Sequence, residues 1–204
     1  MTRSELSGDS ALSTGGTATA VLSSLEQCGF IRRFRNFTKD KTDYCYQLTD
    51  SFTLFYLDII ESRNVESWIS FIDSPGYYNW AGLAFEKVCL LHTKQIKAKL
   101  GIAGLKTSEV SWHSKKTSPG VQIDLMIDRA DQAINLCEVE FASDQYAITA
   151  AEERNLRHRK EAFRAETGTE KSLFLTMITS YGLVKNAHWQ IVAEELTESD
   201  LFIE

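Results

Sequence analysis

The sequence lacks the segments that mark several common classes of protein. No apolar run in its 204 residues approaches the roughly 20 residues that a membrane-spanning helix needs. The first ten residues, MTRSELSGDS, contain no apolar signal-peptide segment. No Gly-rich phosphate-binding loop occurs, so we expect no nucleotide to be bound by that device. We therefore expect a cytoplasmic protein with no membrane partner.

Cysteine and histidine are few and scattered, with four of each. The cysteines form no CxxC pair and the histidines have no metal-ligand spacing, so we expect reduced, mostly buried thiols and neither a zinc site nor a disulfide framework. No Ser–His or Cys–His arrangement suggests a nucleophilic enzyme. The residues concerned are Cys28, Cys45, Cys89, Cys137, His92, His113, His158 and His188.

Composition fits a globular protein, with 43% hydrophobic and 11% aromatic residues. The length allows one medium domain or two small ones. The net charge of −6 argues against a chain that coats nucleic acid non-specifically, but it leaves room for a local basic groove.

Residues 1–65 predict a small winged-helix domain. A helix is expected over 18–28, with Val21, Leu22 and Leu25 at core spacing and Gly29 ending it. Two strands, 30–37 and 43–48, follow around a polar turn, and the apolar run 50–60 predicts a second helix. A helix followed by a two-stranded wing is the winged-helix pattern.

The predicted wing is basic, which allows two interpretations. Five cations fall within residues 32–41, and they could contact phosphates. Alternatively, the hairpin is a solvated surface of a domain that only packs on a neighbour, which is favoured because the helix 17–26 has no Arg or Lys to read bases. The candidate DNA-binding residues are Arg32, Arg33, Arg35, Lys39 and Lys41.

Residues 66–204 predict a second, mixed domain with the order α-β-β-β-α-β-β. The first helix is expected over 80–100, with an apolar stripe of Ala84, Val88, Leu91 and Ile96. The second helix is expected at 149–166, with Leu156 and Phe163 in the core. The strands are expected at 109–114, 121–128, 133–141, 171–179 and 189–193.

The stretch VQIDLMIDRADQAINLCEVEF, residues 121–141, predicts a β-hairpin with an acidic face. Glu138 and Glu140 are separated by one residue and share a face of the second strand. With a three-residue loop at 130–132, the register sets Asp124 directly opposite Glu138. The hairpin therefore predicts three carboxylates on one face of a sheet.

Two opposed carboxylates repel unless one is protonated or a cation lies between them. Oxygen ligands favour Mg²⁺, Ca²⁺ or Mn²⁺ over zinc. One hypothesis is therefore a metal site built from Asp124, Glu138 and Glu140. The alternative is a solvated hairpin face with no partner. An Arg or Lys held between the two carboxylates would instead leave the fold in place without the metal chemistry.

The order and the acidic pattern resemble the PD-(D/E)xK nuclease-like fold. A helix with Glu86, a strand with Asp124 and the pair Glu138-x-Glu140 precede a second helix. The segments TATAVLSSLEQCGFI, YQLTDSFTLFYLDII, GLAFEKVCLLH, QIDLMIDRADQAINLCEVEF and KSLFLTMITSYGL are similar to the C-terminal region of a prokaryotic AAA-type ATPase family. In that family a winged helix and a restriction-endonuclease-like α-β-β-β-α-β core follow the ATPase, which this sequence lacks. We therefore expect a detached C-terminal portion.

The resemblance implies Mg²⁺- or Mn²⁺-dependent phosphodiester hydrolysis on DNA, in which Asp124 and Glu138 hold the metal and Glu86 assists from the helix. The family motif places a Lys two residues after Glu138, where this chain has Glu140. A carboxylate there could act as a general base or bind a second metal, and Lys115 or Lys116 could replace the missing charge in space. The alternative is a catalytically inactive binding or regulatory module that serves the ATPase.

Overall fold

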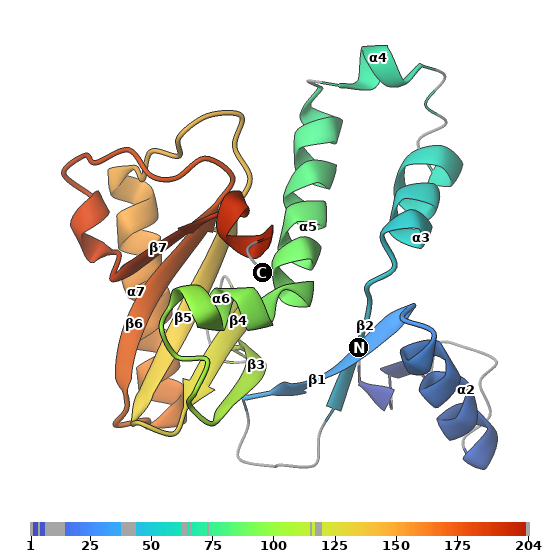
Figure 1. The fold of residues 1–204 in the computed structure, drawn as a ribbon, viewed down its shortest axis with the longest axis horizontal. Helices are drawn as coiled ribbons and strands as arrows, with labels where there is room; N and C mark the ends of the chain where they lie inside the picture. The colour runs from blue at the N-terminus through green and yellow to red at the C-terminus, as the bar shows by residue number, and fades with distance from the viewer. Residues whose placement is uncertain are drawn as a thin grey trace. The chain divides into compact units, whose positions relative to one another are not determined.

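The computed structural model describes residues 2–3, 5–6, 15–37, 44–62, 65, 67–72, 74–114, 116 and 120–202 (Figure 1). Seven strands and six α-helices lie within these residues, so the protein is of mixed α/β class. The chain divides into two compact units, residues 1–80 and residues 81–204. We describe each unit by itself.

Within the described residues, no helix combines the length and the apolar character required to cross a membrane.

The first unit begins with helix α2, Gly16–Gln27. It ends as expected, because Gly29 adopts a left-handed φ of 77° that lets the N–H of Phe30 bond to the carbonyl of Leu25 at 3.0 Å. Leu22 is buried, whereas Val21 is 39% exposed. The predicted helix is confirmed, and the assignment of Val21 to its core is wrong because that side chain lies on the outer face.

The predicted hairpin is confirmed as strands β1, Ile31–Asn36, and β2, Tyr44–Leu48, which pair antiparallel. The turn expected between them lies outside the described residues. The apolar run that follows is helical as expected: α3, Ser51–Phe55, continues into the π-helix Tyr56–Glu61. A short helix α4, Trp68–Phe71, lies in the segment expected to connect the two modules.

The helix predicted over 80–100 is two helices, α5, Pro75–Leu91, and α6, Thr93–Lys99, separated at His92. Pro75 suits a helix start, because its missing N–H would have no partner in the first turn. The predicted stripe is confirmed at Ile96, which is fully buried, and at Val88, which packs against the core, but it is wrong at Leu91. Ala81, Phe85 and Cys89 are buried at a spacing of four, whereas Leu91 is 55% exposed. The bulky Phe85 therefore decides which side of α5 enters the core.

The second unit contains a five-stranded sheet in the order β3-β4-β5-β6-β7. The first three strands are antiparallel, and β5, β6 and β7 are parallel. Helix α7, Ala150–Thr167, connects β5 to β6, as a parallel pair requires a crossover. The strands are β3 Thr107–His113, β4 Gln122–Arg129, β5 Ala133–Glu140, β6 Ser172–Thr179 and β7 Glu194–Thr197. The expected order α-β-β-β-α-β-β is confirmed.

The last strand lies later in the chain than the sequence pattern indicated. Residues 189–193 were expected to form it, but Trp189–Ile191 is a 3₁₀ turn and the strand is Glu194–Thr197. Trp189, Ile191 and Val192 pack against the buried side chains of Leu175 and Met177. These apolar side chains therefore pack on the core, and their segment does not pair as a strand of the sheet.

Helices cover both faces of this sheet (Figure 1). On one face, Phe85 and Cys89 of α5 and Ile96 of α6 pack against strand residues that include Leu125 and Cys137. On the other, Leu156 of α7 packs against Leu175 and Met177 of β6. Leu156 and Phe163 are buried, as expected from their spacing along α7.

The four cysteines are free, as expected. Cys89 and Cys137 are buried, whereas Cys28 is exposed and Cys45 is half-buried, so the expectation of burial holds for two of the four. Burial raises the pKa of the Cys89 thiol to about 12. That thiol is therefore a packing group and not a reactive one.

Candidate functional site

The acidic hairpin has the register that the sequence predicts. Leu125 pairs with Cys137 and Asp128 with Ile134, and the same register carried one residue further sets Asp124 opposite Glu138. Gln132, the last residue of the three-residue loop, adopts a φ of 63°. A left-handed residue at that position is typical of three-residue hairpin loops, and here Gln takes the place of the usual Gly.

The acidic residues of β5 lie on the face that α7 covers. Glu138 pairs in register with Met177 of β6, and Met177 packs against Leu156 of α7. Cys137 points to the opposite face, against α5 and α6. Glu138 and Glu140 share their face, as expected, and both line one pocket between β5, β6 and α7.

A capping box determines where α7 begins. The hydroxyl of Thr149 accepts the N–H of Glu152 at 3.2 Å, and a carboxylate oxygen of Glu152 accepts the N–H of Thr149 at 2.7 Å. This reciprocal pair satisfies two N–H groups that have no partner within the helix. From this start, Glu152, Asn155 and Arg159 follow at spacings of three and four residues, so one side of α7 faces the pocket.

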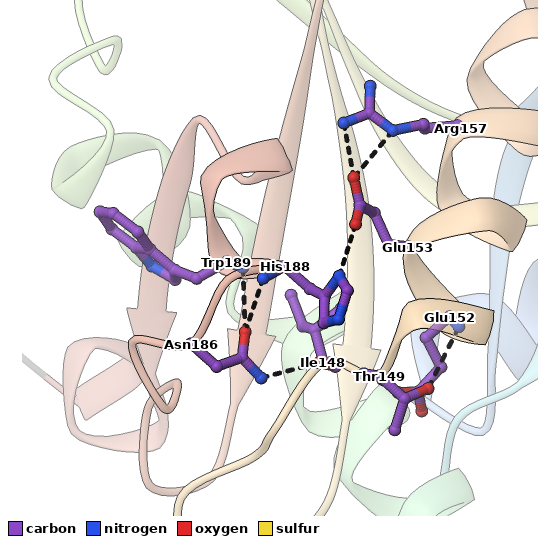
Figure 2. A network of polar contacts seen from close by, with 8 residues as sticks. All are labelled: Ile148, Thr149, Glu152, Glu153, Arg157, Asn186, His188 and Trp189. Carbon is purple, nitrogen blue, oxygen red and sulfur yellow. Dashed lines mark hydrogen bonds and ion pairs between the residues drawn. The ribbon is translucent and has the colours of Figure 1, made fainter.

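A second polar network ties the chain after β6 to the start of α7 (Figure 2). The side-chain amide of Asn186 donates to the carbonyl of Ile148 at 2.8 Å, and its oxygen accepts the N–H of His188 at 2.9 Å. Nδ1 of His188 lies 2.7 Å from Oε2 of Glu153, and Oε1 of the same carboxylate accepts from Nη2 of Arg157 at 2.6 Å. These contacts hold the first turns of α7, and with them Glu152, against the sheet.

The pocket has about 60 Å³ of water-accessible space, enough for a few water molecules or a hydrated ion. Its polar side chains include three carboxylates and one guanidinium, and its base is apolar. The lining residues are Glu138, Glu140, Tyr146, Ile148, Glu152, Asn155, Leu156, Arg159 and Met177.

Glu138 is the most deeply buried carboxylate of the pocket, with 8% of its surface exposed. Burial raises its pKa from the usual 4.5 to about 7, the charge of Arg159 opposes the shift, and the charges of Glu140 and Asp124 add to it. Nη1 of Arg159 donates directly to a carboxylate oxygen of Glu138, and the two form an ion pair. The chain therefore supplies its own cation to this carboxylate.

The pKa values of the two neighbouring carboxylates, Glu140 and Glu152, are shifted in opposite directions. Burial and the nearby charge of Glu152 raise the pKa of Glu140, with Arg159 opposing. Burial also raises the pKa of Glu152, but hydrogen bonds from the phenol of Tyr146 and from Thr149 outweigh it and lower that pKa overall. Glu152 is thus ionised at neutral pH, and its charge disfavours ionisation of Glu140.

Asp124 is half-buried at the edge of this arrangement and does not line the pocket. The side-chain amide of Gln122 donates to its carboxylate. Asp124 is near enough to Glu138 for its charge to raise the pKa of that residue. The structure therefore brings Asp124, Glu138 and Glu140 together electrostatically, but only the last two share a cavity.

Glu86 lies elsewhere in the second unit. It forms an ion pair of 2.7 Å with Lys87, and it does not line the pocket. Its neighbours Phe85 and Cys89 pack on the face of the sheet opposite to α7. The structure does not place this carboxylate beside the other three.

The implied divalent metal does not fit the pocket in this arrangement. Within the described residues, no group of three or more His, Cys, Asp or Glu side chains is placed to hold a metal ion. The guanidinium of Arg159 takes up a carboxylate oxygen of Glu138 that a metal would need. Of the two lysines considered as substitutes, Lys115 lies outside the described residues and the main-chain N–H of Lys116 bonds to Ser114.

Sequence reasoning did not single out Arg159, Tyr146, Glu152 or Asn155 as members of the site. The sequence pattern placed Arg159 only within the helix expected at 149–166. Its spacing of seven residues from Glu152 is the signal that would have placed both on one side of α7. The pairing with Glu138, 21 residues away, has no signal in the local sequence.

The candidate DNA-binding residues are divided between two faces of the first unit's hairpin. Arg33 and Arg35 are exposed, and each lies over the ring of Tyr44. Nε of Arg32 donates to the side chain of Gln47 at 2.9 Å, and these two residues are paired across the strands. Lys39 and Lys41 lie outside the described residues.

Comparison of the chain with protein-family models, with curated proteins and with solved structures found no match. The function is therefore argued from the residues and their geometry.

Proposed function

We propose that residues 81–204 form a PD-(D/E)xK nuclease-like domain whose acidic site is neutralised by Arg159, and that it acts as a non-hydrolytic, DNA-associated module of an ATPase. The α-β-β-β-α-β order, with three antiparallel strands and a parallel fourth, supports the fold assignment. The observation that carries the proposed function is the Arg159–Glu138 ion pair within the pocket.

Two features of the pocket argue against hydrolysis. Phosphodiester cleavage requires positive charge where negative charge develops on the phosphate. Glu140 replaces the Lys of the motif and adds negative charge instead, and the cation that is present, Arg159, is already engaged by Glu138. An incoming phosphate would therefore meet Glu140 and Glu152 without an uncommitted cation among the lining residues.

Metal-dependent hydrolysis of DNA is the second candidate function. It is favoured by the closeness of Glu138, Glu140 and Asp124, because burial raises the pKa of Glu138 and the charges of the other two carboxylates add to that shift. A divalent cation would relieve that repulsion more fully than one guanidinium, and Mg²⁺ or Mn²⁺ suits oxygen ligands. The side chain of Arg159 is 40% exposed, so it has room to move away from Glu138.

Nicking of supercoiled plasmid distinguishes the two candidates. The non-hydrolytic function predicts no nicking by the wild-type chain with either Mg²⁺ or Mn²⁺. Metal-dependent nicking that is lost in Asp124→Ala would establish the second candidate and overturn the first. Glu140→Lys restores the charge of the motif, so nicking by this variant alone would show that one side chain separates the present site from an active one.

The association with DNA and with an ATPase are parts of the same proposal. The hairpin of the first unit, with its exposed Arg33 and Arg35, supports a nucleic-acid partner, and the winged-helix assignment of that unit rests on the helix α2 and this hairpin. The ATPase partner rests on the sequence resemblance alone. Co-elution of this chain with a separately expressed ATPase domain from that family, on size-exclusion chromatography, tests it directly.

A further inference from the structure

One face of the β1–β2 hairpin combines two arginines with two tyrosines. Arg35 pairs with Tyr44 and Arg33 with Tyr46 in the antiparallel register. Paired residues point to the same side, and residues two apart on a strand also share a side. The four side chains therefore form one surface, which we call the arginine–tyrosine face: Arg33, Arg35, Tyr44 and Tyr46.

The two guanidinium groups of this face are held against one ring. Cζ of Arg33 lies 4.6 Å from the centroid of the Tyr44 ring, and Cζ of Arg35 lies 5.3 Å from it. Nη2 of Arg35 also donates to the phenol oxygen of Tyr44 at 2.9 Å. Both arginines are exposed. Because a guanidinium has five N–H donors, these contacts orient the two groups without using all of their donors.

Planar cations beside half-buried aromatic rings suit nucleic acid whose bases are unstacked. Arginine binds phosphate oxygens through charge-assisted hydrogen bonds, and bases stack on aromatic rings and on guanidinium planes. A duplex keeps its bases stacked inside, so it offers phosphates and base edges to the arginines but no base plane on which a tyrosine ring could stack. Helix α2, the other candidate for contact with a duplex, has no Arg or Lys.

We infer that the arginine–tyrosine face binds single-stranded nucleic acid, with Arg33 and Arg35 on the phosphates and Tyr44 stacked on a base. This deepens the DNA association of the proposed function and is independent of the chemistry of the acidic pocket. Glu26 of α2 partly balances the positive charge of this face, because its carboxylate lies 3.6 Å from Nε of Arg33. An incoming phosphate would compete with Glu26 for that guanidinium.

Fluorescence anisotropy with the full chain and a labelled oligothymidine of about 16 nucleotides tests the inference. We expect the single strand to bind more tightly than a duplex of equal length. Tyr44→Leu should weaken single-strand binding about tenfold, whereas Tyr44→Phe, which keeps the ring, should retain most of it. Arg33→Gln and Arg35→Gln should each reduce the slope of log K against log salt by about 0.7.

Two further variants sharpen the result. Glu26→Gln removes the competing carboxylate and should strengthen binding. Arg154→Gln changes the net charge as Arg35→Gln does, but on an exposed residue of α7, and it should leave affinity unchanged. Thermal unfolding of each variant separates loss of the site from loss of the fold. An oligouridine that binds as well as the oligothymidine would extend the same chemistry to RNA.

Three outcomes would overturn the inference: no binding at low salt, a duplex bound as tightly as the single strand, or full affinity in a folded Tyr44→Leu variant. Each leaves the pocket untouched, so it can be told from a failure of the proposed function, which is read from nicking and metal binding. Conversely, a wild-type chain that nicks plasmid would overturn the non-hydrolytic function and leave this inference standing.

Discussion

The acidic pocket and the arginine–tyrosine face hold like charges together in opposite ways. In the pocket, Glu138 is buried, and the chain neutralises it with Arg159. On the hairpin, Arg33 and Arg35 are exposed, and solvent screens their repulsion, with Glu26 at 3.6 Å from Arg33 as a weak counterion. Burial, and not the number of like charges, therefore decides whether the chain supplies an opposite charge to a cluster or leaves its charged groups free to bind a partner.

Removing the internal cation should give the largest effect. Arg159→Gln leaves Glu138 buried beside two other carboxylates, and we expect a loss of about 2 kcal/mol in the free energy of unfolding at pH 8. This is below the value for a fully buried pair because the Arg159 side chain is 40% exposed. Urea unfolding measures it, with Arg154→Gln as the control for charge.

The effect of Arg159→Gln on stability should also depend on pH. At pH 5, Glu138 is protonated in the folded chain, so the loss caused by Arg159→Gln should shrink. A loss of equal size at both pH values would mean that Arg159 acts through packing of its stem, and the contrast between the two regions would fail.

The pH dependence of stability gives the second effect. The pKa of Glu138 is about 7 in the folded chain, above its usual 4.5. Between these values the folded chain binds more protons than the unfolded chain, so stability falls as pH rises through that window. Glu138→Gln should flatten this part of the urea-unfolding profile. Some slope should persist, because the pKa of Glu140 is also raised. An unchanged profile would contradict the assignment.

Tyr146→Phe should have a smaller effect. It removes the hydrogen bond that the phenol donates to Glu152 and keeps the ring, so we expect a loss of about 1 kcal/mol. With that bond gone, the pKa of Glu152 should rise, which NMR titration of the side-chain carboxyl carbon can follow. A Glu152 titration identical to that of the wild type would show that Tyr146 does not hold this carboxylate ionised.

The smallest effect on stability is expected on the hairpin. Arg35→Gln should change the midpoint of thermal unfolding by less than about 2 °C, since exposed substitutions of this kind rarely matter to the fold. The same variant should weaken binding of single-stranded nucleic acid. A large loss of stability would show that Arg35 contributes to the stability of the fold. The contrast between an exposed face that is available to a partner and a pocket neutralised by the chain itself would then be wrong.

The local pattern was sufficient to predict most of the second unit's elements. The acidic hairpin follows from the alternation of Val121, Ile123, Leu125 and Ile127 and from a loop length that fixes its register. Helix α7 follows from the core spacing of Leu156 and Phe163, both of which are buried. Each of these signals lies within a few residues of the structure it determines.

Other features depend on contacts between distant segments. The buried side of α5 is set by how Phe85 and Cys89 fit the sheet, and the helix period allowed either of two neighbouring stripes. Trp189 and Ile191 are residue types that are common in strands, but they form a 3₁₀ turn whose side chains pack against the core under α7. Spacing along the chain cannot reveal either choice.

The candidate site was predicted only in part for the same reason. Spacing predicted the shared face of Glu138 and Glu140 and the opposition of Asp124 to Glu138. It did not predict Arg159 as the partner of Glu138, because that contact depends on how α7 crosses the sheet. On the hairpin, the sequence showed the arginines but not that Arg33 and Arg35 both contact the ring of Tyr44, nor that Arg32 lies on the other side.

Calorimetric titration of the wild-type chain with MnCl₂ shows whether Arg159 excludes a divalent ion from Glu138, because the guanidinium and the ion compete for the same carboxylate. We expect no binding at micromolar Mn²⁺ by the wild-type chain, and binding that becomes measurable in Arg159→Gln. Micromolar binding by the wild-type chain that disappears in Glu138→Gln would contradict this expectation.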